Sequence, residues 1–230
     1  MWRIRLDSLA SEQDWTLLSP DEQERARRFH FERDRRSFVL SHGMLRCLLG
    51  QYADVPGAQL EFTTGAFGKP SMCGAPALEF NLSHSGDIAL LAVSRDRAVG
   101  VDVERWNTGI EHVELAQHFF SVAECRALRE LAVTDEQRAA GFFAAWSRKE
   151  AYLKAIGQGI TRGLDHFDVS LVPDEPARLI ADRLDAAATE RWVMTSLAPA
   201  EGYSAALVAA APVGAILLFD ATSPSASHRR

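Results

Sequence analysis

The sequence predicts an α/β (α+β) protein of two similar halves, each a small antiparallel or mixed sheet with helices. Three observations support this prediction. Short apolar segments with strand-like alternation occur in both halves of the chain. Ser-x-x-Glu capping boxes, which start helices, occur at residues 19–22 and 121–124. Residues 86–104 also align without a gap on residues 202–220 with a largely matching apolar pattern, which indicates an internal repeat.

The predicted first half spans residues 1–105. Its first strand is WRIRL, in which apolar residues alternate with arginines. The capping box, with proline at the first helical position, predicts a helix from Ser19 to about Phe31. A second helix, DRRSFVLSHGMLRCLLG, is predicted to stop near Gly50. The other predicted strands are LEFTT, ALEFNLS, DIALLAVS and AVGVDVE, the last two joined by a short hairpin at residues 95–97.

The predicted second half spans residues 106–222. The second capping box opens the helix FSVAECRALRELA, and a longer helix, EQRAAGFFAAWSRKEAYLKAIG, follows. Strands are then predicted in LDHFDVSLV and ERWVMTSLA, and a final strand pair in YSAALVAAAPVGAILLF, which Pro212 and Gly214 interrupt. The small, polar tail 223–230 is expected to be disordered.

Composition narrows the class of protein. The chain has 230 residues, 47% of them hydrophobic and 24% charged, which is typical of a soluble globular protein. A net charge of -6 argues against a nucleic-acid partner, which needs a basic surface. No apolar run approaches the roughly 20 residues needed to cross a membrane, and no signal peptide is apparent. The three cysteines form no CxxC pair. We therefore expect reduced thiols and a cytoplasmic location.

Two segments carry charged residues that call for a partner. In VGVDVE (99–104), Asp102 and Glu104 point to the same side of a predicted strand, and two like charges there are costly without a cation or hydrogen bonds. In WSRKEAYLKAIGQG (146–159), Glu150 and Lys154 lie one helical turn apart, on the same stripe as Trp146. A solvated Glu–Lys pair is the simplest interpretation of that helix. The neighbouring aromatic residues instead indicate that this face approaches the core.

Taken together, Asp102, Glu104 and Glu150 would make an oxygen-rich site suited to Mg²⁺, with Mn²⁺ as a possible substitute. Nearby lysines fit a phosphate group better than a calcium site. The pattern therefore points to a metal-bridged pyrophosphate, whose oxygens the metal and Lys154 would neutralise.

Four segments, in this order and spacing, closely resemble the Sfp-type 4'-phosphopantetheinyl transferases: GKPSM, FNLSHSGD, VGVDVE and WSRKEAYLKAIGQG. The resemblance implies a pseudo-twofold, two-lobed fold. It also implies a holo-[acyl-carrier-protein] synthase activity, in which the 4'-phosphopantetheine group of coenzyme A moves to a serine of an apo acyl or peptidyl carrier protein. This reaction requires Mg²⁺ and releases 3',5'-ADP. Fatty acid, polyketide, nonribosomal peptide and lysine-type carriers are all compatible with the sequence.

The resemblance also assigns site residues. Asp102, Glu104 and Glu150 match the metal ligands, and Lys154 matches a lysine that contacts the pyrophosphate and stabilises charge as its bond breaks. Glu150 is the candidate general base, directly or through a metal-bound water. Glu150 and Lys154 are thus the expected catalytic residues.

Coenzyme A is expected to contact several further residues. By resemblance, Ser83 and His84 contact its phosphates, Arg25 contacts its 3'-phosphate, and Lys69 matches a lysine that binds coenzyme A. Asn81 and Ser85 are expected to shape a turn. At a second basic position of the family this chain has Glu22. Arg36 is expected to compensate, because it would lie on the same helix face as Arg25 after three turns. Arg46 is a further candidate. The full expected set is Arg25, Arg36, Lys69, Ser83, His84, Lys149 and Lys154.

Other functions remain open at this point. A Mg²⁺-dependent coenzyme A or nucleotide pyrophosphatase would use the same carboxylates but activate water. A non-catalytic coenzyme A-binding module would keep the fold alone. Since both halves lie in one chain, we expect a monomer, with carrier docking near residues 110–130.

Overall fold

The structure is a computed structural model that describes residues 1–75, 77–131, 134–173 and 175–221. The predicted tail, residues 223–230, lies outside the described residues. The strands are β1 (Trp2–Arg5), β2 (Phe62–Thr64), β3 (Pro70–Met72), β4 (Leu78–Ser85), β5 (Ile88–Arg95), β6 (Val99–Arg105), β7 (Phe167–Val169), β8 (Leu179–Asp182), β9 (Trp192–Leu197), β10 (Tyr203–Ala210) and β11 (Phe219–Ala221). The helices are α1 (Glu12–Leu17), α2 (Pro20–Arg27), α3 (Glu32–Ala53), α4 (His112–Phe119), α5 (Val122–Leu131), α6 (Asp135–Ala155) and α7 (Ala188–Arg191). Short 3-10 helices lie at Gly57–Gln59, Ile160–Arg162 and Leu164–His166.

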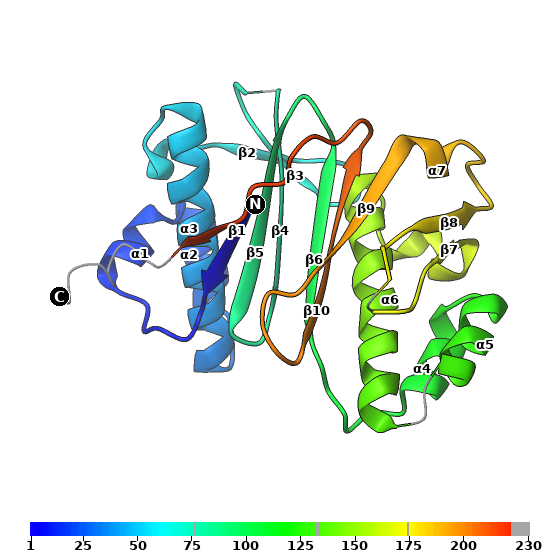
Figure 1. The fold of residues 1–230 in the computed structure, drawn as a ribbon. Helices are drawn as coiled ribbons and strands as arrows, with labels where there is room; N and C mark the ends of the chain where they lie inside the picture. The colour runs from blue at the N-terminus through cyan, green and yellow to red at the C-terminus, as the bar shows by residue number, and fades with distance from the viewer. Residues whose placement is uncertain (76, 132–133, 174, 222–230) are drawn as a thin grey trace.

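The molecule has two lobes, each a small sheet backed by one long helix (Figure 1). The N-terminal lobe contains α3 and the sheet β11-β1-β5-β4, and the C-terminal lobe contains α6 and the sheet β6-β10-β9. Within these sheets only the pair β1–β11 is parallel among the described strands. Strands β2–β3 and β7–β8 form separate two-stranded sheets. The mixed, two-lobed α/β architecture predicted from the sequence is confirmed.

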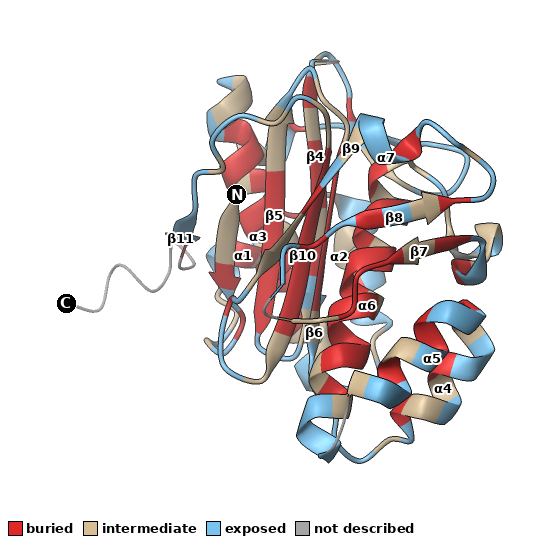
Figure 2. Ribbon diagram, turned by 45° about the vertical axis from the view of Figure 1, so that its right-hand side comes forward, coloured by how far each residue is buried: buried red, intermediate tan, exposed pale blue. Residues whose placement is uncertain are grey.

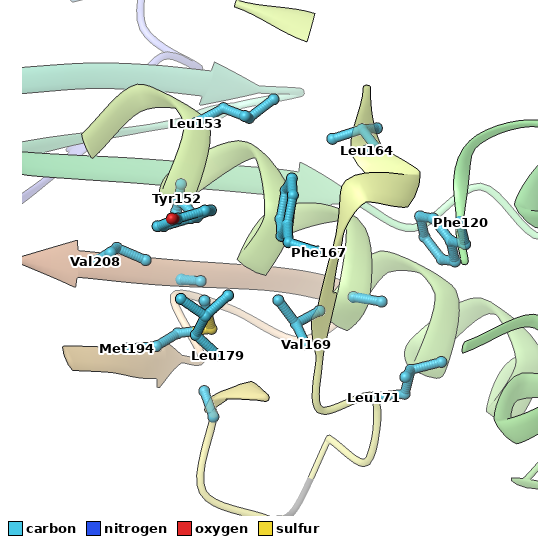
Figure 3. Packing of buried hydrophobic residues seen from close by; sticks show 14 of the residues in the cluster. Phe120, Tyr152, Leu153, Leu164, Phe167, Val169, Leu171, Leu179, Met194 and Val208 are labelled. Atoms are coloured by element: carbon cyan, nitrogen blue, oxygen red, sulfur yellow. The ribbon is translucent and has the colours of Figure 1, made fainter. Parts of the chain in front are cut away.

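Three of the hydrophobic clusters that the described residues form hold these layers together. Leu40 and Leu49 of α3 pack with Phe80 and Leu91 of the N-terminal sheet. In the C-terminal lobe, α6 packs against the face of β9 and β10 and against the β7–β8 segment, as Figure 3 shows for Tyr152 among its neighbours. The third core lies between the two sheets. Figure 2 shows that buried residues follow one another along most of β4, β5, β6 and β10.

The shared core between the sheets is built from alternate residues of three strands. Leu90 of β5, Val101 and Val103 of β6, and Leu207 of β10 belong to it. Their apolar side chains point to this core, so the neighbouring residues of the same strands point to the opposite face. On β6 these neighbours are Gly100, Asp102 and Glu104. The strand alternation therefore directs both carboxylates toward α6.

The two lobes repeat the same strand connections. In sequence order each contains a strand, a long helix and two more strands, and the last strand lies between the other two in the sheet. By this pattern β10 corresponds to β5, as the sequence alignment of residues 86–104 on 202–220 implied. The same alignment placed β6 on residues 215–220, which is wrong, because β6 corresponds to β1. The boundary after residue 105 stays a prediction, although the pairing of β6 with β10 favours a division before β6.

Both predicted capping boxes are confirmed. Ser19 and Glu22 cap α2 reciprocally, and the same two bonds join Ser121 and Glu124 at α5. However, α2 ends at Arg27 and not near Phe31. Phe29 leaves the helix to pack on Phe38, and the acidic first turn of α3 starts a new helix at Glu32.

The predicted hairpin between β5 and β6 is wrong. Residue Asp96 takes a left-handed conformation, with φ 59°, and its N–H donates to Ala77 O at 2.8 Å. The chain then crosses to the other sheet, where β6 pairs with β10. Strand β6 packs on the face of β5 through the shared core and does not extend its edge. Local alternation predicted both strands but could not reveal how they meet.

The end of the chain also differs from the prediction. Strands β10 and β11 do not pair with each other, because β11 returns to the N-terminal lobe and lies parallel to β1. The helices α1, α4 and α7 and the strands β3 and β8 were not predicted from the sequence. Among the described residues, no helix combines the length and the apolar character that crossing a membrane requires.

Candidate active site

The candidate site lies along the seam where β4 of one lobe meets β6 of the other. The side chain of Ser83 on β4 donates a hydrogen bond to Asp102 Oδ1 at 2.8 Å. Two residues further along, Ser85 Oγ donates to Glu104 Oε2 at 3.1 Å. Residues two apart on a strand share a face, so Ser83 and Ser85 contact Asp102 and Glu104, respectively, with the same spacing along the two strands.

Helix α6 brings the remaining charged groups to this seam. An added Cβ at Gly100 would lie only 2.2 Å from Ala151 O and 2.3 Å from Ala155 N. Only glycine allows β6 and α6 to approach this closely. The contact places Glu150 and Lys154, which lie one turn apart on α6, beside Asp102.

Lys154 is the cation of the cluster. Its Nζ donates to Asp102 Oδ1 at 2.6 Å and to Ser83 Oγ at 3.1 Å. The Lys154 side chain keeps 29% of its surface exposed, whereas that of Asp102 keeps 4%. The lysine thus neutralises a buried carboxylate while part of it still faces solvent.

The three carboxyl groups are nevertheless undercompensated. Burial raises the pKa of Glu104 to about 7, and the charge of Asp102 adds to this rise. Burial also raises the pKa of Asp102. The pKa of Glu150 is raised by burial and then by the charge of Asp102. One lysine therefore faces three acids that influence one another, and an additional cation would lower the energy of their charged forms.

The donor atoms fit a hard divalent cation. Asp102 Oδ2 and Glu150 Oε1 are buried without a hydrogen-bond partner among the described residues, and such atoms call for a ligand. No group of three Asp, Glu, His or Cys side chains in the described part of the chain forms a ready-made metal site. The magnesium site thus remains a prediction, supported by carboxylate chemistry and by the two unpartnered oxygens.

Two expected coenzyme A contacts lie on the N-terminal lobe. His84 follows Ser83 on β4 and is exposed. Arg25 is exposed on α2, and its guanidinium lies 5.1 Å from the centre of the Phe38 ring. His42 belongs to the same small group, because its ring stacks on Phe38. Arg25 and His84 are thus open to solvent, while Phe38 is buried.

Lys69 is bound to the backbone at the start of the seam. Its Nζ donates to Val99 O at 3.0 Å and to Ala155 O at 3.5 Å, and Glu79 lies 3.8 Å away. Burial lowers the pKa of Lys69. The lysine thus joins the beginning of β6 to the carboxyl end of α6, where a cation is favourable.

Two residues of the predicted set do not join the cluster. Because α2 and α3 are separate helices, the argument that placed Arg36 on one helix face with Arg25 is wrong. The pKa of Asp7 is lowered chiefly by its hydrogen bond with Arg5, and Arg36 adds a smaller electrostatic contribution there. Lys149 is fully buried and donates to Leu164 O at 2.7 Å and Phe167 O at 2.6 Å.

Lys149 also forms an ion pair with Glu124 at 2.8 Å. This buried pair ties α5 and α6 to the β7 segment, so Lys149 has a structural place and is closed to coenzyme A. Arg46 is likewise used inside the fold. It pairs with Glu22 at 2.6 Å and donates to two backbone carbonyls.

The sequence analysis missed the role of two polar residues. Asn81 and Ser85 were expected to shape a turn, but both lie within β4. Asn81 Oδ1 accepts the N–H of Val101 at 2.8 Å. The signal that could have revealed them is the spacing of Asn81, Ser83 and Ser85, which places three polar side chains on one face of a strand.

Comparisons with known proteins agree over nearly the whole chain. A family model described as 4'-phosphopantetheinyl transferase, N-terminal, matches residues 8–96, and one described as 4'-phosphopantetheinyl transferase superfamily matches residues 98–208. These ranges meet in the connection between β5 and β6.

Curated relatives carry the same description. The 4'-phosphopantetheinyl transferase HetI of Nostoc sp. is 39% identical over 215 residues, which is 91% of this chain and 86% of HetI. The 4'-phosphopantetheinyl transferase psf-1 of Bacillus pumilus is 37% identical, with 71% of this chain and 68% of psf-1 covered. The 4'-phosphopantetheinyl transferase Sfp of Bacillus subtilis is 30% identical over 71% of either chain.

Proposed function

The chain belongs to the 4'-phosphopantetheinyl transferase superfamily, and we propose that it transfers the 4'-phosphopantetheine group of coenzyme A to a serine of an apo carrier protein. The observation that supports this most directly is the cluster at the seam. The segments in which the family resemblance is strongest contain the buried carboxyl group of Asp102, the half-buried ones of Glu104 and Glu150, a partly exposed lysine and two serines.

Asp102, Glu104 and Glu150 would hold Mg²⁺, or Mn²⁺ in its place, which when bound neutralises charge on the pyrophosphate of coenzyme A. Two of these residues provide the buried oxygens that have no hydrogen-bond partner among the described residues. The raised pKa of Glu104 agrees with a site in which negative charge is in excess.

The chain's own residues then serve the transfer. The serine oxygen of the carrier forms a bond to the phosphorus that bears pantetheine, and the bond from that phosphorus to the bridging oxygen breaks. Released 3',5'-ADP takes the bridging oxygen. Lys154 stabilises charge on the departing phosphate. Glu150 accepts the serine proton, directly or through a water bound to the metal.

Coenzyme A would be bound from the N-terminal lobe. Ser83 and His84 would contact its phosphates, and exposed Arg25 its 3'-phosphate. Lys69 would contribute positive charge from the start of β6. Arg36 and Lys149 lose support as contacts, for the structural reasons given above.

We further propose a cytoplasmic monomer. The described part of the chain contains both lobes, and residues from both form the site. The free cysteines agree with a reducing compartment. The partner is an apo acyl or peptidyl carrier protein, and the exposed residue Val122 on α5 supports the expected docking region.

Intact-mass spectrometry of an apo carrier protein tests this function. Incubation with the protein, coenzyme A and Mg²⁺ should add one phosphopantetheine to the carrier, and EDTA should abolish the gain. An Asp102→Ala variant is the matched control and should be inactive while still folded. Hydrolysis of coenzyme A without any gain in carrier mass would instead establish a pyrophosphatase. Intact coenzyme A with several carrier classes would leave only a binding module.

A further inference from the structure

Strand β6 is an edge strand on the side that faces β4. Its other edge pairs with β10, and no backbone ladder joins it to β4 among the described strands. An edge of this kind leaves backbone N–H and C=O groups without partners. Buried backbone groups must nevertheless be hydrogen-bonded.

Side chains take the place of a neighbouring strand along this edge. Alternate residues of a strand direct their backbone groups to the same side. Here Val99 O accepts from Lys69, Val101 N–H donates to Asn81, and Arg105 N–H donates to Ser85 Oγ at 3.1 Å. Between them, the carboxylate of Asp102 accepts from the N–H of Val103.

The three polar residues of β4 divide this work. Ser83 contacts Asp102 and Lys154, so it belongs to the charged cluster itself. Asn81 binds only backbone on β6, and Ser85 binds both the backbone of Arg105 and the carboxylate of Glu104. A serine hydroxyl has one donor and two acceptor sites, so Ser85 can make both bonds at once.

The register of β6 against β4 decides whether the two carboxylates meet the serines of β4. A slip of β6 by one residue along β4 would carry Asp102 away from Ser83 and Glu104 away from Ser85. We propose that Asn81 and Ser85 are positioning residues, which lock the register of β6 against β4 and orient Glu104 for the cation. This inference rests on the proposed function only in naming the cation as the group that Glu104 serves.

The Ser85 series tests the proposal with two readouts. Amide hydrogen exchange measured by NMR reports the register, and Mn²⁺ titration without coenzyme A or carrier reports the cation site. In Ser85→Ala, the Arg105 amide should exchange at least about tenfold faster while the Val101 amide stays protected. Mn²⁺ affinity should fall about tenfold, as expected when a residue that orients a ligand is lost.

Two further variants are the controls. Ser85→Thr keeps the hydroxyl, so its Arg105 exchange rate and its Mn²⁺ affinity should both stay within about threefold of the wild type. Ser94→Ala removes a serine from β5 of the same hairpin, outside the seam, and should change neither. Asn81→Ala should expose the Val101 amide, and the Ser85 series remains decisive if that variant does not fold.

The outcomes separate this proposal from the proposed function. Unchanged Arg105 exchange in Ser85→Ala would overturn the register lock. Faster exchange with unchanged Mn²⁺ affinity would overturn the positioning of Glu104 and leave Ser85 a structural residue. If the wild type bound no Mn²⁺, the proposed cation site would fail. The exchange rates would then decide the register lock, faster exchange supporting it and unchanged exchange refuting it.

Discussion

At the scale of single residues, charge balance governs the candidate site. Lys154 bonds to one oxygen of Asp102, whereas Glu104 and Glu150 are half-buried in the same cluster and have raised pKa values. The protein thus holds acids that resist ionisation at the place where a cation and a phosphate group are expected to meet. Variants of single residues can separate these contributions.

Lys154→Ala should lower kcat about a hundredfold or more and change the KM for coenzyme A much less, because the lysine acts on charge that develops in the transition state. Steady-state kinetics with coenzyme A and a saturating apo carrier measures this split. An effect on KM alone would make Lys154 a binding residue.

Glu104→Gln should stabilise the metal-free protein at pH 8. The pKa of Glu104 in the fold, about 7, lies above the ordinary value of 4.5. The folded state therefore holds the proton more tightly, and stability falls as the pH rises from about 4.5 to about 7. The Glu104→Gln variant, which lacks this charge, should therefore have a free energy of unfolding about 1–3 kcal/mol higher than the wild type at pH 8, measured by urea unfolding. Mg²⁺ should stabilise the wild type but not the variant, and equal stabilisation of both would contradict a role in metal binding.

His42 should have the opposite pH dependence. Burial lowers its pKa from 6.5 to about 4, so the folded state keeps the ring neutral. As the pH falls from about 6.5 to about 4, the His42 ring takes up a proton in the unfolded chain but not in the folded one. The free energy of unfolding therefore decreases over this interval. Over that pH interval, the free energy of unfolding of the His42→Gln variant should decrease by about 2–3 kcal/mol less than that of the wild type. Urea unfolding at pH 7 and pH 4.5 tests this, and parallel pH profiles would refute it.

At the scale of secondary-structure elements, the contact between β6 and α6 controls the site. These two elements carry all three carboxylates and Lys154, and they approach each other over Gly100. Any side chain there would separate the helix from the strand. The geometry of the cluster thus depends on one residue that has no chemistry of its own.

Gly100→Ala should destabilise the protein by about 1–3 kcal/mol and strongly reduce transfer, because its methyl group would overlap the backbone of α6. Gly214→Ala is the matched control, since an added Cβ there meets no described atom within 4 Å. Thermal unfolding and the carrier-modification assay measure both effects. If the two variants had equal stability and equal transfer activity, the close contact between β6 and α6 would not be required for either.

At the scale of the whole molecule, the lobes are joined by a common core and by the chain ends. The core between the sheets takes residues from β5, β6 and β10. Strand β11 follows the C-terminal lobe in sequence yet pairs with β1 of the N-terminal lobe. Neither lobe can thus unfold without exposing apolar surface of the other.

Leu90→Ala should lower stability by about 2–5 kcal/mol and destabilise both lobes equally, because Leu90 lies in the shared core and is 1% exposed. NMR amide signals of α3 and α6, followed through urea unfolding, should disappear at the same midpoint. Ile180→Ala, at a residue 58% exposed on β8, should have little effect. Separate midpoints for the two helices would show that the lobes unfold independently.

The sequence by itself determined the strands β1, β4, β5, β6 and β10, both capping boxes, the long helix α6 and the charged groups of the seam. These features depend on spacing within one element, which sets the side chains that share a face. Tertiary structure alone decided that β6 packs across β5, that β11 returns to β1 and that Lys149 is buried against Glu124. It also revealed Asn81 and Ser85 as partners of β6. Such relations join residues far apart in the chain, and they are set by the burial of surfaces that no local pattern describes.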